Sequence, residues 1–291
     1  MKQALIIGID STIGGLLNTE LSVAGWCVYG TSRSRGSINN KIFYLDLLNV
    51  DDFSMELDID VVFLCASLTR LSTCREYREL CQKINIDAQL QLSKYFLSRG
   101  IHVVFLSTSA VFSGEKPCYR ISDATSPITV YGESKAIAEK KLLNLSENIS
   151  VVRLTKVLTP TYPLICKWID VLSGDKCIEP FYDLYVCPIS IRMVTSCLKE
   201  IAEKKITGII HLSGDKDISY LIIAEHLVRY LKSNSALINP RSALESGIDI
   251  SEAPLYTSLD MTESRRLFVL PDTKLSTVLS SLYGIDYQLT I

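Results

Sequence analysis

The 291-residue sequence lacks several features that mark particular classes of protein. Its nine cysteines include no Cys-x-x-Cys pair and its three histidines are scattered, which argues against both a zinc site and a disulfide framework. Lys and Arg total 30 against 32 Asp and Glu, so the basic excess of a nucleic-acid-binding protein is missing. No apolar run reaches the ~18 residues that a transmembrane helix needs. We therefore expect no metal, no nucleic-acid partner and no membrane span.

Hydrophobic residues, in contrast, are abundant at 47%, which excludes a disordered chain. The first eight residues are mostly apolar, but Asp10 interrupts the run early and no cleavage site of small residues follows. We interpret them as a buried strand rather than a secretory signal. Because most cysteines lie inside apolar runs, we expect reduced, buried thiols in a cytoplasmic protein.

Short apolar runs alternate with helical periodicity through the first half of the chain. This pattern is typical of a parallel sheet covered on both faces by helices, and predicts a Rossmann-type, doubly wound α/β fold. The predicted strands span residues 4–8, 27–31, 42–46, 61–66, 103–106, 151–154 and 208–213. The predicted helices span residues 13–24, 75–98, 131–144, 189–204, 218–232 and 275–283.

The second half is richer in loops and prolines, and it suggests a smaller lobe interleaved with the last sheet elements. We expect a cofactor-binding Rossmann domain at residues 1–159 and 188–213. Residues 160–187 and 214–291 would then form a C-terminal substrate-binding lobe.

A glycine-rich turn, Gly8-Ile9-Asp10-Ser11-Thr12-Ile13-Gly14, follows the first predicted strand. Glycines at such spacing between a strand and a helix let the backbone approach a pyrophosphate, which the helix N-terminus stabilises. Ser11 stands where the middle glycine of a Gly-x-x-Gly-x-x-Gly pattern would be. The turn predicts a dinucleotide site, and a plain tight turn is the alternative.

The end of the second strand contains Ser32 and Arg33 and no acidic residue. An NAD site usually has Asp or Glu here for the ribose 2′-hydroxyl, whereas Arg with small hydroxyl residues suits the 2′-phosphate of NADP. Asp46 and Leu47, after the third strand, fall where adenine contacts are expected. We therefore predict NADP as the cofactor, with NAD as the second choice. The alternative is that this segment is a solvent-exposed basic loop that binds no cofactor.

Tyr131 and Lys135 form the one Tyr-x-x-x-Lys pair in the sequence. Positions i and i+4 share a helix face, so Lys135 can lower the pKa of the Tyr131 phenol and let it act as general acid or base. The preceding strand ends in Ser107 and Thr108, at the sheet edge where ligands of such folds bind. A hydroxyl there can polarise a substrate carbonyl. A Ser/Thr-rich strand end beside a surface helix is the non-functional alternative.

With these residues, the chain resembles the extended short-chain dehydrogenases/reductases, and within that superfamily the dTDP-4-dehydrorhamnose reductase-like group of nucleotide-sugar enzymes. The similarity covers nearly the whole length, and its most specific parts are residues 107–114 and the pair Tyr131 and Lys135. It implies an oxidoreductase of polysaccharide biosynthesis that reduces, or epimerises through, a keto group on a nucleotide-linked sugar.

The resemblance also implies roles for single residues. Tyr131 would be the catalytic acid/base, Thr108 would bond to the substrate carbonyl, and Asn85 would support the active-site helix and relay water to Lys135. The residues implied at the cofactor are Gly8, Ser11, Thr12, Ile13, Gly14, Ser32, Arg33, Asp46, Leu47, Cys65, Ala66, Ser67, Tyr131 and Lys135. A homodimer, paired through the helices that contain Asn85 and Tyr131, is implied as well.

Ser109 and Ala110 depart from the patterns of the superfamily. Nucleotide-sugar 4,6-dehydratases have an Asp-Glu pair there, so dehydration is not expected, and the rhamnose-type reductases usually have Asp-Tyr, which leaves the sugar open. Lys156, Lys167 and Arg192 are candidate phosphate contacts in the second half. The alternative from another class is a non-catalytic regulatory or binding protein on the same fold, like the regulatory β subunit of methionine adenosyltransferase.

Overall fold

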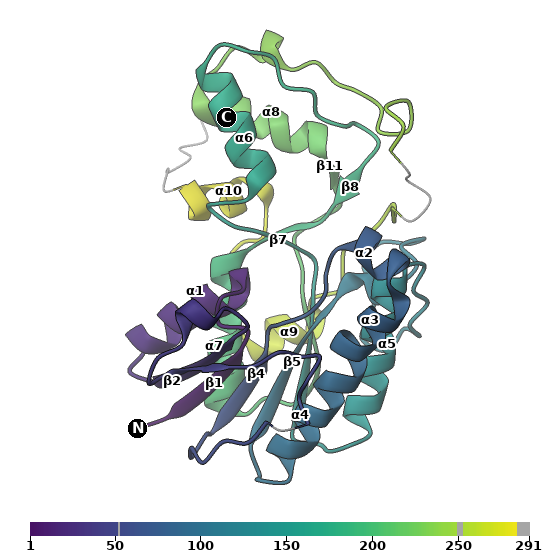
Figure 1. Ribbon diagram of the computed structural model, residues 1–291. Coiled ribbons are helices and arrows are strands. Elements are labelled where there is room, and N and C mark those ends of the chain that lie inside the picture. Colours follow the sequence, from purple (N-terminus) through teal and green to yellow (C-terminus); the bar gives the residue numbers. More distant parts are fainter. Residues whose placement is uncertain (52, 249–252, 284–291) are drawn as a thin grey trace.

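The computed structural model describes residues 1–51, 53–248 and 253–283 (Figure 1). In this part of the chain, seven parallel strands form the central sheet of the larger lobe. Their spatial order is β10 (Gly208–Leu212), β6 (Ile149–Leu154), β5 (His102–Thr108), β4 (Val61–Leu64), β1 (Gln3–Ile7), β2 (Cys27–Ser32) and β3 (Ile42–Tyr44). The chain order reverses between β1 and β4, which is the point where doubly wound sheets bind their ligands. The predicted Rossmann-type fold is confirmed.

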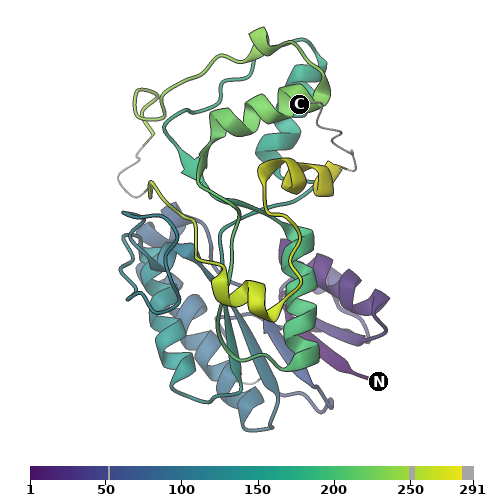
Figure 2. The same ribbon diagram turned by 180° about the vertical axis from the view of Figure 1, so that it is seen from behind.

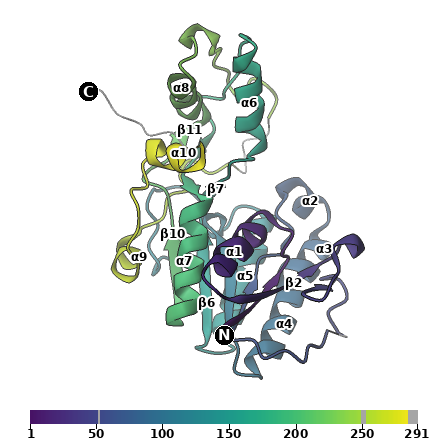
Figure 3. The same ribbon diagram turned by 90° about the vertical axis from the view of Figure 1, so that its left-hand side faces the viewer.

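Helices cover both faces of this sheet (Figure 3). Successive side chains of a strand point to opposite faces, and β1 shows the consequence, because Ala4 and Ile6 belong to one apolar core and Leu5 and Ile7 to the other. The first core includes residues of α1 and α7, and the second includes residues of α4 and α5. The bounds of these helices are α1 (Thr12–Val23), α4 (Ala88–Leu97), α5 (Val130–Leu143) and α7 (Ile191–Lys204).

The long helix predicted over residues 75–98 is interrupted. The structure has α2 (Leu71–Glu76), α3 (Arg78–Gln82), a π-helical turn (Lys83–Asp87) and then α4. Tyr77 leaves the helical conformation between α2 and α3, with φ −119° and ψ 66°. The π-helical turn contains Asn85, and such turns occur frequently at functional sites. The apolar spacing does not reveal these interruptions, because they depend on tertiary contacts.

The smaller lobe lies beyond the carboxyl edge of the sheet and has an apolar core of its own (Figure 1). Its helices are α6 (Pro163–Ser173), α8 (Tyr220–Leu231) and α10 (Leu275–Tyr283), and β8 (Tyr185–Val186) pairs antiparallel with β11 (Ile218–Ser219). Where the chain passes between the lobes, β7 (Lys156–Leu158) pairs parallel with β9 (Pro188–Ser190). The sequence pattern missed α6, which begins at Pro163, a position where proline is well tolerated.

One segment of the C-terminal part packs against the larger lobe instead. Helix α9 (Thr262–Leu267) lies beside β10 (Figure 2), and Met261 and Phe268 at its ends are buried in the first core of the sheet. The expected domain division assigns all of residues 214–291 to the smaller lobe. It therefore does not predict that α9 packs against the larger lobe.

The cysteines are all unpaired, but fewer of them are buried than expected. Cys74, Cys81, Cys187 and Cys197 are buried, whereas Cys118 and Cys177, the only two of the nine that are fully exposed, lie in loops. Within the described ranges, none of the helices combines the length and the apolar character that crossing a bilayer requires.

Candidate active site at the carboxyl edge of the sheet

Two cavities open side by side at the carboxyl edge of the sheet. The larger, about 940 Å³, lies between the lobes, and the smaller, about 520 Å³, lies over the ends of β1, β2 and β4. They are continuous, because both are lined by Thr12, Ile13, Cys65, Ser67 and Thr69. The combined volume suits a ligand pair such as a dinucleotide and a second molecule.

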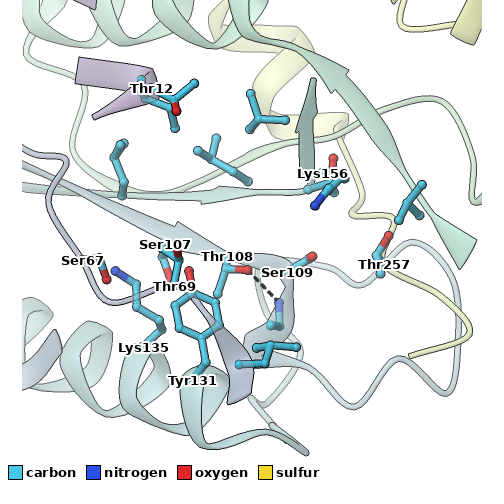
Figure 4. A pocket seen from close by; sticks show the side chains of 18 of the residues that line it. Thr12, Ser67, Thr69, Ser107, Thr108, Ser109, Tyr131, Lys135, Lys156 and Thr257 are labelled. Carbon is cyan, nitrogen blue, oxygen red and sulfur yellow. Dashed lines mark hydrogen bonds between the residues drawn. The ribbon is translucent and has the colours of Figure 1, made fainter. Parts of the chain in front are cut away.

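Thr108, Tyr131 and Lys135 come together in the larger cavity (Figure 4). Helix α5 begins beside the loop after β5, where the hydroxyl of Thr129 caps it by accepting a hydrogen bond from the amide of Gly132 at 2.9 Å. A side chain at Gly132 would collide with the carbonyl oxygen of Ala110, so glycine allows the helix to approach the end of β5. The approach brings the Tyr131 phenol beside Thr108.

The Tyr131 phenol is a proton donor rather than a phenolate in this arrangement. Burial raises its pKa well above the usual range, and a hydrogen bond with Thr108 opposes that shift only in part. The lowering that we expected from Lys135 does not appear, because the removal of water from the phenol dominates. Tyr131 therefore holds its proton at neutral pH.

Lys135 is the most deeply buried cation of the site, with 2% of its surface exposed. Its ammonium lies 3.8 Å from the centroid of the Phe105 ring. Burial lowers its pKa to about 7, against the opposing attraction of Glu139 one helical turn further on. Small changes in the occupancy of the cavity can therefore change its protonation state.

Glu139 belongs to a buried ionic network that the sequence analysis missed. It forms a fork-like ion pair with Arg153 on β6, with a shortest distance of 2.7 Å, and it accepts a hydrogen bond from the hydroxyl of Ser107. Arg153 also bonds to His211 on β10 at 3.3 Å, and the other ring nitrogen of His211 donates to the carbonyl of Asp260. This network fixes the strand end beneath Thr108.

Asn85 lies outside both cavities. Its amide nitrogen donates to Ser134 on α5 and to the carbonyl of Leu68, and its carbonyl oxygen accepts from Ser67 and from the amide of Leu68. These bonds saturate the side chain, and the water relay to Lys135 stays a prediction. Asn85 ties the loop after β4 to α5, as expected of a residue that supports the active-site helix.

The glycine-rich turn between β1 and α1 packs closely against the residues after β4. Gly8 has φ +84°, and a Cβ there would lie 2.7 Å from that of Ala66. Gly14 lines neither cavity and its amide donates to the hydroxyl of Ser11, so it serves packing and is not available to a phosphate. Ser11 has an ordinary φ of −72°, and its side chain turns back to cap α1.

The smaller cavity collects most of the residues expected at the cofactor. Its lining includes Gly8, Ser11, Thr12, Ile13, Ser32, Arg33, Asp46, Leu47, Cys65, Ala66 and Ser67. Among the described residues, no group accepts a hydrogen bond from the backbone amides of Thr12 and Ile13, at the N-terminus of α1. Free amides at a helix N-terminus suit a pyrophosphate. Burial raises the pKa of the Cys65 thiol to about 12, so a neutral thiol faces both cavities.

The smaller lobe lines part of the larger cavity. Lys156 lines it together with Tyr162, Tyr185 and Tyr220, whereas Lys167 and Arg192 are exposed elsewhere. The charged residues on the described part of its wall are Arg75, Lys135 and Lys156, which are all cationic. Lys156 is thus the one of the three candidate phosphate contacts that lines this cavity. The tyrosines could be placed here only by the structure, since no local motif marks them.

Comparisons with known proteins place the chain in a family. Residues 1–283 match the family model for the RmlD substrate binding domain. The methionine adenosyltransferase 2 subunit beta of Xenopus laevis is 24% identical, covering 77% of this chain and 70% of the relative. A Haloferax volcanii protein named "Probable low-salt glycan biosynthesis reductase Agl14" is 22% identical, covering 89% of this chain and 90% of the relative.

Solved structures show the same fold. The dTDP-4-dehydrorhamnose reductase of Bacillus anthracis, in complex with NADP, superposes with a TM-score of 0.83 at 21% identity, covering 98% of this chain and 99% of that one. MoeE5 in complex with UDP-glucose and NAD gives 0.77 at 18% identity, covering 97% of both chains. Since the family model spans nearly the whole sequence, the chain belongs to the RmlD substrate binding domain family.

Proposed function

We propose that this protein is an NADP- or NAD-dependent reductase that acts on a keto group of a nucleotide-linked sugar. The observation on which this rests is the meeting of Thr108, Tyr131 and Lys135 in the larger cavity, which shares part of its lining with the smaller one. The NADP complex of a similar fold and the sugar nucleotide bound by MoeE5 support the choice of cofactor and substrate class.

The smaller cavity would hold the dinucleotide. The amides of Thr12 and Ile13 would bind its pyrophosphate, Ser32 and Arg33 would face the adenosine ribose, and Asp46 with Leu47 would line the adenine side. When bound, the reduced nicotinamide supplies a hydride. With this placement, residues 1–159 and 188–213 would form the cofactor-binding domain. Residues 160–187 and 214–291 would contribute side chains to the substrate-binding site.

In the reduction, the substrate carbonyl carbon gains the hydride and its oxygen gains the proton of Tyr131. The Thr108 hydroxyl donates a hydrogen bond to that oxygen and polarises the C=O bond. Lys135, in its charged form, stabilises the tyrosinate that remains, until solvent returns the proton. In the reverse direction, the oxidation of a hydroxyl to the ketone, the tyrosinate form of Tyr131 would act as base. An epimerase would need this oxidation step in addition to the reduction.

The cationic wall of the larger cavity favours an anionic substrate. Lys156 would contact the diphosphate, and the rings of Tyr162, Tyr185 and Tyr220 would face the nucleoside. The ammonium of Lys156 rests 5.1 Å from the centroid of the Tyr162 ring, so it is already directed along the cavity wall.

Replacement of Tyr131 by Phe tests the mechanism. General acid catalysis contributes about 10²–10⁴-fold, so Tyr131→Phe should lower kcat by that factor and leave NADPH binding unchanged. The assay follows NADPH oxidation with a panel of dTDP- and UDP-linked 4-ketosugars, after a fluorescence titration of the cofactor. Tyr77→Phe, at an exposed tyrosine outside the cavities, is the matched control. Wild-type turnover by Tyr131→Phe would exclude Tyr131 as the acid.

A second candidate is a non-catalytic subunit on the same fold. The similarity to methionine adenosyltransferase 2 subunit beta favours it, as does Ser11 in place of a glycine. It predicts tight binding to another protein and no turnover of ketosugars. Failure to bind either NADPH or NADH would favour this candidate over the reductase.

A further inference from the structure

The carboxylate missing from the end of β2 is supplied by another part of the chain. Asp10, in the turn after β1, is exposed and lines the smaller cavity next to Ser32 and Arg33. The Ser32 hydroxyl donates a hydrogen bond to Asp10 Oδ2 at 2.8 Å. A side chain 22 residues away in sequence therefore reaches the place where an NAD site has its acidic residue.

Ser32 holds the carboxylate of Asp10 by a directed hydrogen bond. Ser32 is 2% exposed, and its oxygen also accepts a hydrogen bond from the amide of Ser34 at 2.9 Å, so the hydroxyl is directed at Asp10. Within the described ranges, no group donates to the second carboxylate oxygen, Oδ1. That oxygen is free to accept a hydrogen bond from a ligand in the cavity.

Arg33 lies on the same wall with the opposite charge. It is exposed and forms no ion pair with a described residue, whereas the next arginine, Arg35, stacks on the ring of Tyr44 at 4.8 Å. The wall thus has one exposed anion and one exposed cation, which would face the substituent at the 2′ position of the adenosine ribose.

We propose that Asp10 selects the cofactor by accepting a hydrogen bond from the ribose 2′-hydroxyl of NADH and repelling the 2′-phosphate of NADPH. Arg33 attracts that phosphate, so the two side chains oppose each other and the protein uses both cofactors. The proposal rests on the proposed function, because it concerns the same dinucleotide site.

The test is a titration of the full-length protein with NADPH and NADH, followed by nicotinamide fluorescence and by calorimetry. Asp10→Asn keeps an oxygen that can accept from Ser32 but removes the charge. We expect it to tighten NADPH binding about tenfold, weaken NADH binding severalfold, and so raise the preference for NADPH. Arg33→Gln should shift the preference in the opposite direction, mainly by weakening NADPH binding.

Asp58→Asn is the charge-matched control, because Asp58 is exposed and lines neither cavity. It should leave both dissociation constants unchanged. The gain in NADPH affinity from Asp10→Asn should also shrink at 0.5 M salt, because repulsion between exposed charges is screened.

If wild type and Asp10→Asn bind both cofactors with the same ratio of affinities, Asp10 is not a selecting residue, and the proposed function stands. If neither cofactor binds to the wild type, both proposals fail together. A salt-independent gain would also contradict the inference, since it would indicate a change of loop structure rather than of charge.

Discussion

Lys135 places a charged group where the fold offers little solvation. Its folded pKa is lowered to about 7, whereas an unfolded lysine titrates near its ordinary value of 10.5. Between these two pH values the unfolded chain binds a proton that the folded chain does not. The contribution of Lys135 to the free energy of unfolding is therefore most unfavourable below pH 7, and it becomes less unfavourable as the pH increases from about 7 toward 10.

Lys135→Met should consequently stabilise the protein at neutral pH while it abolishes catalysis. We expect a gain on the order of 1–3 kcal/mol at pH 6.5, measured by urea denaturation, which decreases as the pH is raised to 9.5. Lys140→Met, at an exposed lysine on the same helix, should change stability by less than about 0.5 kcal/mol at either pH. A destabilised Lys135→Met at pH 6.5 would show that the ammonium is well solvated.

Single residues also show how far sequence reasoning reaches at this scale. The Tyr-x-x-x-Lys pair and the strand-end threonine could be predicted because local periodicity places them on one helix face and at one sheet edge. Asp10 and Glu139 could not, because their partners Ser32 and Arg153 are 22 and 14 residues away and no local pattern links them. Asn85 was found through family resemblance, but its saturated hydrogen bonds were visible only in the structure.

At the scale of elements, the position of α5 depends on Gly132. A methyl group there would overlap the carbonyl of Ala110, so the helix would have to move away from the loop between β5 and α5. We expect Gly132→Ala to cost about 1–3 kcal/mol of stability. Because a shift of about 1 Å in a reacting group can cost 100-fold, kcat should fall by about that factor while cofactor affinity changes little.

Gly15→Ala is the matched helix control. Its added methyl group would lie 3.4 Å from the carbonyl oxygen of Ile9, which is ordinary contact, and alanine is favoured over glycine inside a helix by about 0.5–1 kcal/mol. The control should therefore be neutral or stabilising in thermal denaturation. If Gly132→Ala behaves in the same way and keeps its kcat, the close approach of α5 is not needed.

Across the whole molecule, the strands and the doubly wound fold class followed from the apolar runs, because strands buried on both faces are continuously hydrophobic. The spatial order of the strands came from the structure. The arrangement of the smaller lobe did not follow. Its core joins α6, α8 and α10, which are far apart in sequence, and α9 returns to β10 through buried Met261 and Phe268. Such long-range packing leaves only a weak periodic pattern in a loop-rich segment.

Two buried histidines in the central sheet link its stability to pH. His102 on β5 and His211 on β10 have pKa values lowered to about 4, in both cases mainly by burial. His102 bonds to Ser150 through Nε2 at 2.7 Å, and its Nδ1 is buried without a partner. Unfolding lets both imidazoles return to a pKa near 6.5, so the unfolded chain takes up protons between pH 6.5 and pH 4.

Stability should therefore fall as the pH is lowered through that window, by up to about 1.4 kcal/mol per pH unit for each histidine. Trp26 lies in the core of the larger lobe and Trp168 in that of the smaller lobe, so Trp168→Phe leaves a fluorophore that reports on the sheet. In this background, urea denaturation at pH 7, 6, 5 and 4.5 measures the slope. His102→Gln should reduce the number of protons taken up on unfolding by about one and so make the slope shallower, because a neutral amide replaces one of the titrating rings. Two outcomes would contradict this prediction: a His102→Gln variant with the same pH dependence of the free energy of unfolding as its parent, or a parent whose free energy of unfolding does not change between pH 6.5 and 5. Either would mean that the buried rings already accept protons in the folded protein.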